Sequence, residues 1–176
     1  LLTTCLWRCR TIAIQPDQNK EVRILCLINA RPKFNRLLPI GYYGNAFAIS
    51  AAVTTTQKLC ENSLGYALEL EHMQLVADLM VIRGRPSFTM VRSYLVSNVT
   101  RAGFREVDFE WGKATYGGPA KGGLPFFPGV SFYIPSKNGL GEDGIIVPIC
   151  LPTPTMERFV KELDGLLRDK TIVSSL

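Results

Sequence analysis

Apolar residues recur along this chain with two different periods, which predict a mixture of helices and strands. The first thirteen residues repeat apolar side chains at the helical period, with no initiator Met and no capping residue ahead of them. That start is typical of a chain cut from something longer. Near the other end, Thr153 and Pro154 form a helix start, and apolar positions up to Leu167 make one face. We predict a C-terminal helix that docks on a sheet.

Strand character dominates between these two helices. Residues 22–28 are β-rich and apolar on both faces towards their end, which predicts a buried strand. Residues 88–96 return to strand character. Apolar runs at 130–134 and 145–151 flank the turn residues Asn138-Gly139, which predicts a β-hairpin.

The middle of the chain is less regular. Residues 41–47 are interpreted as a glycine-flanked strand or its approach, and residues 54–56 as the cap of a helical stretch that breaks near residues 62–63 and continues to Leu79. Residues 117–129 are mostly Gly, Pro, Ala and Phe, which predicts a loop. Strands mixed with a few helices predict one α/β layered domain.

The composition narrows the choice of partners only slightly. A net charge of +5 permits an acidic partner, but Lys and Arg are scattered and not interleaved with aromatics, so we expect a solvated surface and no nucleic acid. The five cysteines form no Cys-x-x-Cys pair, which favours a reduced, cytoplasmic protein. We see no signal peptide and no apolar run long enough to span a membrane.

Groups that could carry catalysis are few. His72 is the only histidine, and its polar helical surroundings favour a solvated helix residue over a general base. One histidine with dispersed cysteines cannot build a tetrahedral site, so no metal is predicted. The glycine-rich residues 116–123 lack a preceding strand and a following helix, and Pro119 removes a donor, so we interpret them as a connection and not a phosphate cradle.

One segment is hard to explain by packing demands alone. Residues 107–114 place an acid and a Trp around a Gly, between a strand and a glycine-rich loop. The sequence Asp108-Phe109-Glu110-Trp111-Gly112 resembles the Asp-Phe-Gly-Trp-Gly motif of the BAHD acyltransferases. Further stretches occur in the family's order and extend the resemblance over nearly the whole chain: Leu6-Trp7-Arg8, Asn29-Ala30-Arg31, residues 41–45, residues 77–86 and residues 117–121.

This resemblance implies a fold and a reaction. It implies a chloramphenicol-acetyltransferase-like layered domain, with a mixed sheet and helices, as one of two domains around a tunnel. Residues 1–176 would be the C-terminal domain, without the N-terminal domain that carries the family's His-x-x-x-Asp motif. The full-length enzyme would be a monomer that transfers an acyl group from acyl-CoA to a small alcohol, with no metal and no prosthetic group.

The resemblance also assigns roles to residues. Asp108 would pair with Arg31 in a partly buried structural contact. Trp111 and Gly112 would shape the tunnel wall on the CoA side, and Lys113 would meet a CoA phosphate only if it points outward. No residue of this chain would be the catalytic base.

Three departures leave alternatives open. Glu110 stands where the family has Gly, so a positive φ there would be strained. The helical region around residues 70–73 looks shorter than in relatives, and nothing replaces the missing histidine motif. The chain is alternatively a degenerate or spliced paralogue that serves as an interaction module, or an independent binder of CoA or another anion.

Overall fold

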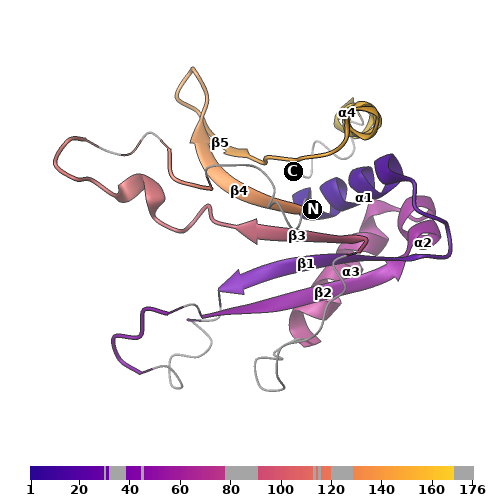
Figure 1. Ribbon diagram of the computed structural model, residues 1–176, viewed down its shortest axis with the longest axis horizontal. Coiled ribbons are helices and arrows are strands. Elements are labelled where there is room, and N and C mark those ends of the chain that lie inside the picture. Colours follow the sequence, from indigo (N-terminus) through magenta and orange to yellow (C-terminus); the bar gives the residue numbers. More distant parts are fainter. Residues whose placement is uncertain are drawn as a thin grey trace.

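A mixed sheet forms the centre of the molecule (Figure 1). The computed structural model describes residues 1–29, 31, 39–44, 46–77, 91–112, 114, 116–119 and 129–168. In these residues the sheet has the order β2-β1-β3-β4-β5. Its strands are β1 (Glu21–Asn29), β2 (Phe47–Thr55), β3 (Ser93–Asn98), β4 (Val130–Lys137) and β5 (Asp143–Ile146).

The strand directions make the sheet mixed. β1 pairs antiparallel with β2 and parallel with β3, and β4 pairs parallel with β3 and antiparallel with β5. Apolar side chains on both faces of β1 explain its central place, since Ile24 and Leu25 point to opposite faces and both are buried. The predicted α/β class is confirmed.

The described helices lie beside this sheet. They are α1 (Leu2–Ile14), α2 (Thr56–Glu61), α3 (Leu64–Ala77) and α4 (Thr153–Arg168), and the loop after β3 contains the 3-10 turn η3 (Phe104–Glu106). The hydroxyl of Thr55 accepts a hydrogen bond from the amide of Lys58 at 3.3 Å, so the predicted cap of α2 is confirmed. The predicted break near residues 62–63 is also confirmed, because α2 ends at Glu61 and α3 starts at Leu64.

The core lies between α1 and the sheet. Trp7 is buried there, the hydroxyl of Tyr133 donates to Oγ1 of Thr3 at 3.0 Å, and the guanidinium of Arg10 lies 5.2 Å from the centre of the Tyr94 ring. These contacts tie α1 to β3 and β4. The principal buried cluster comprises Leu6, Trp7, Cys9, Ala13, Val22, Ile24, Ala52, Leu59, Ala67, Tyr94, Val96, Tyr133 and Phe159.

Residues 41–47 were interpreted as a strand or its approach, and the approach is correct, because β2 begins at Phe47 and continues to Thr55. Two other sequence expectations need correction. The second strand of the hairpin covers Asp143–Ile146 and not residues 145–151. The C-terminal helix packs mainly against α1, whose carbonyl at Ala13 accepts a 2.8 Å bond from Nε of Arg158, and not broadly on a strand.

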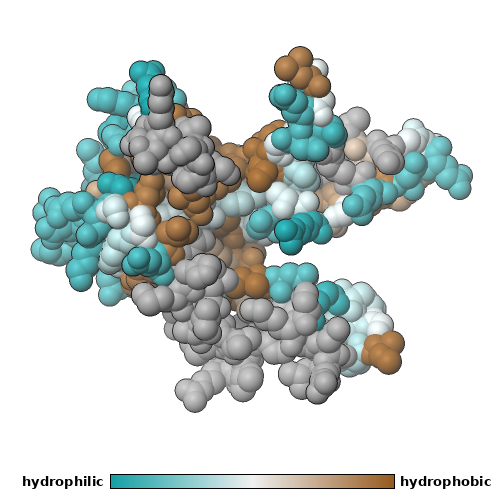
Figure 2. Space-filling model, turned by 180° about the vertical axis from the view of Figure 1, so that it is seen from behind, coloured by the Kyte–Doolittle hydropathy of each residue, from teal (hydrophilic) through white to brown (hydrophobic). Residues whose placement is uncertain are grey.

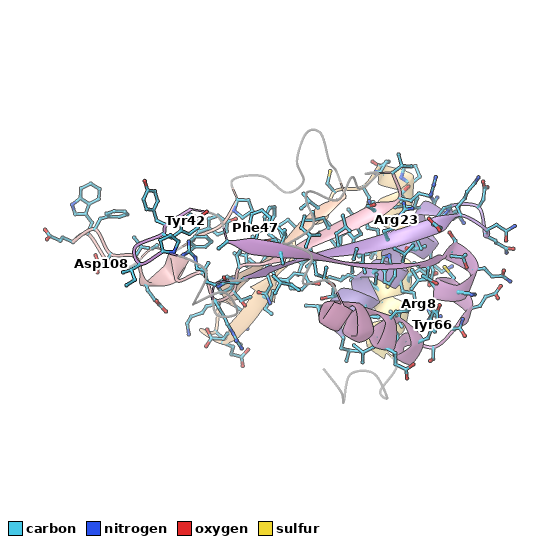
Figure 3. The ribbon with its side chains drawn as sticks, turned by 90° about the horizontal axis from the view of Figure 1, so that it is seen from below. Arg8, Arg23, Tyr42, Phe47, Tyr66 and Asp108 are labelled. Carbon is cyan, nitrogen blue, oxygen red and sulfur yellow. The ribbon has the colours of Figure 1, made fainter. Side chains whose placement is uncertain are left out.

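Two loops extend beyond the strand ends that lie away from the helices (Figure 1). One contains residues 39–44 and leads into β2, and the other contains residues 99–119 and follows β3. Figure 3 shows Asp108 and Tyr42 at this end of the molecule, far from Arg8 and Tyr66 on the helices. Asp108 of the motif and Tyr42 of the stretch 41–45 therefore lie at the exposed end of the sheet, whereas Arg8 of the stretch Leu6-Trp7-Arg8 lies among the helices.

Candidate functional site

Asp108 organises the loop that carries the motif. Its Oδ1 accepts hydrogen bonds from the backbone amides of Glu110 at 2.8 Å and Gly112 at 3.2 Å. The amide of Ala114 donates to the carbonyl of Val107 at 3.3 Å and closes the loop. A side-chain oxygen that binds amides two and four residues ahead fixes a turn without help from any other element. We call residues 107–114 the motif loop.

The backbone of the motif loop enters the left-handed region twice. Glu110 has φ of 70° and Gly112 has φ of 110°. Gly112 adopts this conformation without a steric penalty. Glu110 has a Cβ atom, and residues with a Cβ atom rarely adopt a positive φ. The positive φ considered for Glu110 is thus present in the structure.

The aromatic side chains of the motif loop face outward. Phe109 is 75% exposed and Trp111 is 95% exposed, and a Cβ added to Gly112 would meet no atom within 4 Å. In this structure Trp111 and Gly112 border solvent. Lys113 lies outside the described residues.

Arg31 holds the other extended loop. Its Nη1 and Nη2 donate to the carbonyls of Tyr42 at 2.7 Å and Gly44 at 2.6 Å, and its guanidinium lies 5.7 Å from the centre of the Tyr42 ring. Its own amide donates to Oδ1 of Asn29 at 3.1 Å. We call residues 39–44 the tyrosine loop. Two carbonyls and an aromatic face satisfy the planar cation without a carboxylate.

Asp108 and Arg31 are consequently not joined in this structure. Asp108 is exposed and binds backbone amides of its own loop, and the described partners of Arg31 are carbonyls and a ring. The pair suggested by the resemblance is absent here and stays a prediction for a longer protein. Sequence reasoning missed the Tyr42 and Gly44 carbonyls, although a glycine on each side of two tyrosines indicated a turn near the end of β1.

No catalytic base emerges from the described residues. His72 lies within α3, as the helical pattern predicted, but its side chain lies outside the described structure. In the described part of the chain, no three His, Cys, Asp or Glu side chains come together as a metal site would require. The described residues therefore provide no histidine base for catalysis.

The thiols of Cys5, Cys9 and Cys60 are poorly reactive at neutral pH. Burial raises the pKa of Cys9 to about 12, with further contributions from Cys5 and Glu162, and burial also raises the pKa of Cys5 and of Cys60. A thiol whose pKa is raised is protonated at neutral pH and is a poor nucleophile. None of the described cysteines forms a disulfide, and Cys150 is the exposed one among them.

Comparison with known proteins decides the family. A model of the Transferase family matches residues 1–166. The chain belongs to this family. The match covers both extended loops and α4 up to Leu166, so it extends over nearly all of the fold described above, and the resemblance to the BAHD acyltransferases is confirmed.

Its relatives act on alcohols, according to their names. The chain is 65% identical over 179 residues to benzyl alcohol O-benzoyltransferase of Petunia hybrida, with 96% of this chain and 39% of that protein covered. It is 48% identical over 181 residues to alcohol acyl transferase 2 of Malus domestica, with 96% of this chain and 38% of that protein covered. The chain therefore spans less than half the length of the curated relatives it matches.

Solved structures of low sequence identity share the fold. Vinorine synthase superposes with a TM-score of 0.67 at 13% identity, over 94% of this chain and 40% of that one. TRI101 of F. sporotrichioides, solved in complex with coenzyme A and T-2, superposes with a TM-score of 0.68 at 16% identity. The superposition covers 98% of this chain and 42% of that one. None of the helices that the structure describes combines the length and apolar content that a membrane crossing requires.

Proposed function

We propose that residues 1–176 are the C-terminal domain of an acyl-CoA-dependent alcohol O-acyltransferase. The observation that carries the proposal is the 65% identity to the Petunia hybrida benzoyltransferase over 96% of this chain. The identity to an alcohol acyl transferase of Malus domestica supports the same reaction class with a different named relative. We infer benzyl or short-chain alcohols as acceptors and benzoyl- or acetyl-type CoA thioesters as donors.

The reaction needs a base that this chain does not supply. In the family, a histidine takes the hydroxyl proton of the alcohol, and the alkoxide attacks the thioester carbonyl. The tetrahedral oxyanion then collapses to the ester and expels the CoA thiolate, which takes the proton from the histidine and leaves as free CoA. The present chain has only His72, whose fourth following residue is Val76, so it does not match His-x-x-x-Asp. The base is therefore assigned to the domain outside this chain.

Residue roles in the proposed enzyme follow the resemblance. Trp111 and Lys113 would lie on the CoA side of the tunnel, and Asp108 would approach Arg31 once the second domain is present. The motif loop borders solvent in this structure, which leaves room for both changes. We further propose a cytoplasmic enzyme that works as a monomer with acyl-CoA as co-substrate.

The test joins the missing part of the Petunia relative ahead of Leu1. Release of free CoA from benzoyl-CoA is measured with and without benzyl alcohol, for this chimera and for residues 1–176 alone. We expect alcohol-dependent turnover by the chimera, none by the short chain, and an unchanged rate in the chimera after His72→Ala. Turnover by the short chain that His72→Ala abolishes would refute the proposal.

A non-catalytic paralogue is the second candidate. It is favoured by Glu110, which holds a left-handed backbone at the position where the family motif has Gly. A chimera that unfolds cooperatively but gives no turnover with a panel of alcohols and acyl donors would establish this candidate. Measured binding of CoA by residues 1–176 alone would instead support an independent CoA or anion module.

A further inference from the structure

The two extended loops carry exposed apolar side chains. Tyr43 is 96% exposed, Ile40 is fully exposed, and Phe109 and Trp111 are 75% and 95% exposed. Figure 2 shows two arms that project from the body on the same side with an open space between them. Isolated exposed apolar residues are ordinary, but several on neighbouring arms mark an interaction surface.

Both loops are held in shape by a charged side chain. Arg31 binds the Tyr42 and Gly44 carbonyls of the tyrosine loop, and Asp108 binds the Glu110 and Gly112 amides of the motif loop. A loop fixed by its own hydrogen bonds presents its outward side chains at a lower entropy cost of binding than a free loop does. The exposure of the aromatic residues is therefore a property of folded loops.

We propose that the tyrosine loop and the motif loop together form the surface on which the part of the longer protein outside this chain docks. The proposal rests on the proposed function, because that function requires a second domain. This chain spans 39% of the Petunia relative, so the larger part of that protein lies outside the matched region and is the occupant that we propose. Phe109 and Trp111 would be anchors that fill apolar recesses of that domain.

The size of the surface fits a stable interface. A buried aromatic side chain removes roughly 150–250 Å² from water, so Tyr43, Phe109 and Trp111 would contribute roughly 450–750 Å². A stable interface covers about 800 Å² on each partner. Three aromatics would thus supply a large share of the required area.

Leu140 provides a matched control within the same chain. It is 85% exposed at the tip of the β4–β5 hairpin, and its turn is closed by bonds from the Leu140 and Glu142 amides to Oδ1 of Asn138. Its loop is therefore as well fixed as the other two. A single apolar side chain among polar turn residues needs no partner, so we expect Leu140 to stay in solvent.

The experiment is hydroxyl-radical footprinting, read out residue by residue by mass spectrometry, on the Petunia chimera. The oxidation rate of each residue in the native protein is divided by its rate in urea-unfolded protein. We expect Tyr43, Phe109 and Trp111 to oxidise roughly tenfold more slowly in the native chimera, as residues in the core of an interface do, and Leu140 to change little. Native rates for Trp111 and Tyr43 equal to those in urea would overturn the proposal.

Two further measurements make the outcome decisive. Trp111→Ser is expected to lower the unfolding midpoint of the chimera but not that of residues 1–176, whereas Leu140→Ser changes neither. An equal effect of Trp111→Ser in both proteins would refute docking. Protection of Trp111 in residues 1–176 that grows with concentration would assign the surface to a second copy and also overturn the proposal.

The docking test does not depend on catalysis. Protection of Trp111 in a chimera without turnover would uphold docking and reject the acyltransferase function. Turnover by a chimera in which Trp111 stays exposed would uphold the acyltransferase function and reject docking. If the chimera does not fold, the same ratio is measured in the whole Petunia relative at the positions aligned with Trp111 and Leu140, with the same criteria.

Discussion

Replacement of Glu110 by Gly is expected to stabilise the protein. Glu110 has φ of 70°, where a side chain crowds its own backbone and glycine does not. The amide of Glu110 donates to Asp108, and glycine keeps that amide, so the hydrogen bonding of the motif loop is preserved. The substitution therefore removes strain without removing any bond that the structure shows.

Two opposing effects set the size of this gain. The left-handed conformation costs an L-residue about 1–2 kcal/mol. Glycine in turn loses more conformational freedom on folding, a cost of roughly 0.5–1 kcal/mol. The difference favours Gly by about 0.5–1 kcal/mol. With a urea m-value of about 2 kcal/mol per M for a chain of this size, the midpoint should rise by about 0.2–0.5 M.

Urea unfolding followed by circular dichroism measures this shift. Glu106→Gly is the matched control, because it also removes one exposed carboxylate from the same segment but at a residue that is not among those with positive φ. We expect its midpoint to fall, since only the entropy cost of glycine applies. A fall of equal size for Glu110→Gly, with unchanged m-values, would show that the loop gains from its glutamate and would refute the strain argument.

Four more predictions concern close packing and buried groups. Tyr94 is 1% exposed, and its hydroxyl interacts with the Ser131 side chain without forming a hydrogen bond of full geometry, so Tyr94→Phe should change the free energy of unfolding by less than roughly 1 kcal/mol in a urea titration. Gly117→Ala would place its Cβ 2.2 Å from the Cβ of Phe104 and should lower the free energy of unfolding by about 1–3 kcal/mol in the same titration. Gly144→Ala is the control, because a Cβ there would meet no atom within 4 Å and should cause no overpacking. Because burial holds the pKa of Cys9 at about 12 against an ordinary 9.0, its contribution to stability is complete below pH 9 and is lost as pH rises towards 12. A thiol reagent at neutral pH should label Cys150 in the native protein and Cys9 only after unfolding.

Strong periodicity allowed most elements to be predicted from sequence. The helices at both ends repeat apolar residues at the helical period, and β1 is a short run rich in β-branched residues, which favours a strand. The start of β2 was left open because its strand-forming residues Phe47, Ile49 and Val53 are interspersed with Ala and Ser. β2 forms because it pairs along its whole length with β1, from Phe47 opposite Asn29 to Thr55 opposite Glu21. That pairing is a tertiary effect that no local pattern encodes.

The hairpin shows how a correct pattern gave incorrect strand limits. Apolar residues alternate through Val147, Ile149 and Leu151, and these three do pack against the core. However, the turn closed by Asn138 sets the pairing of β4 with β5, which ends at Ile146. Pro148 lacks an amide donor, so the ladder cannot continue past it, and its carbonyl accepts a bond from Ser131 instead.

The candidate site was predictable in its residues but not in their partners. The motif indicated that Asp108 matters, and the strain expected at Glu110 follows from a glycine position in the family motif. The expected partner of Asp108 came only from resemblance, and the structure gives that carboxylate two amides of its own loop. The partners of Arg31 depend on the positions of the loops in the folded chain. The spacing of residues in the sequence does not determine those positions.

The hydrogen bonds of Asp108 and Arg31 in this structure would still allow the two side chains to pair in a longer protein. The hydrogen bonds that Asp108 accepts from described residues both go to Oδ1, and the side-chain bonds that Arg31 donates come from Nη1 and Nη2. A pair in the longer protein would use the second carboxylate oxygen and would add to the loop geometry without replacing it. Asp108→Asn keeps one acceptor oxygen for the two amides but removes the charge. It should therefore leave residues 1–176 nearly as stable as before, whereas in a chimera where the pair is buried it should cost about 3–5 kcal/mol. Equal effects in both proteins would mean that the carboxylate serves only its own loop.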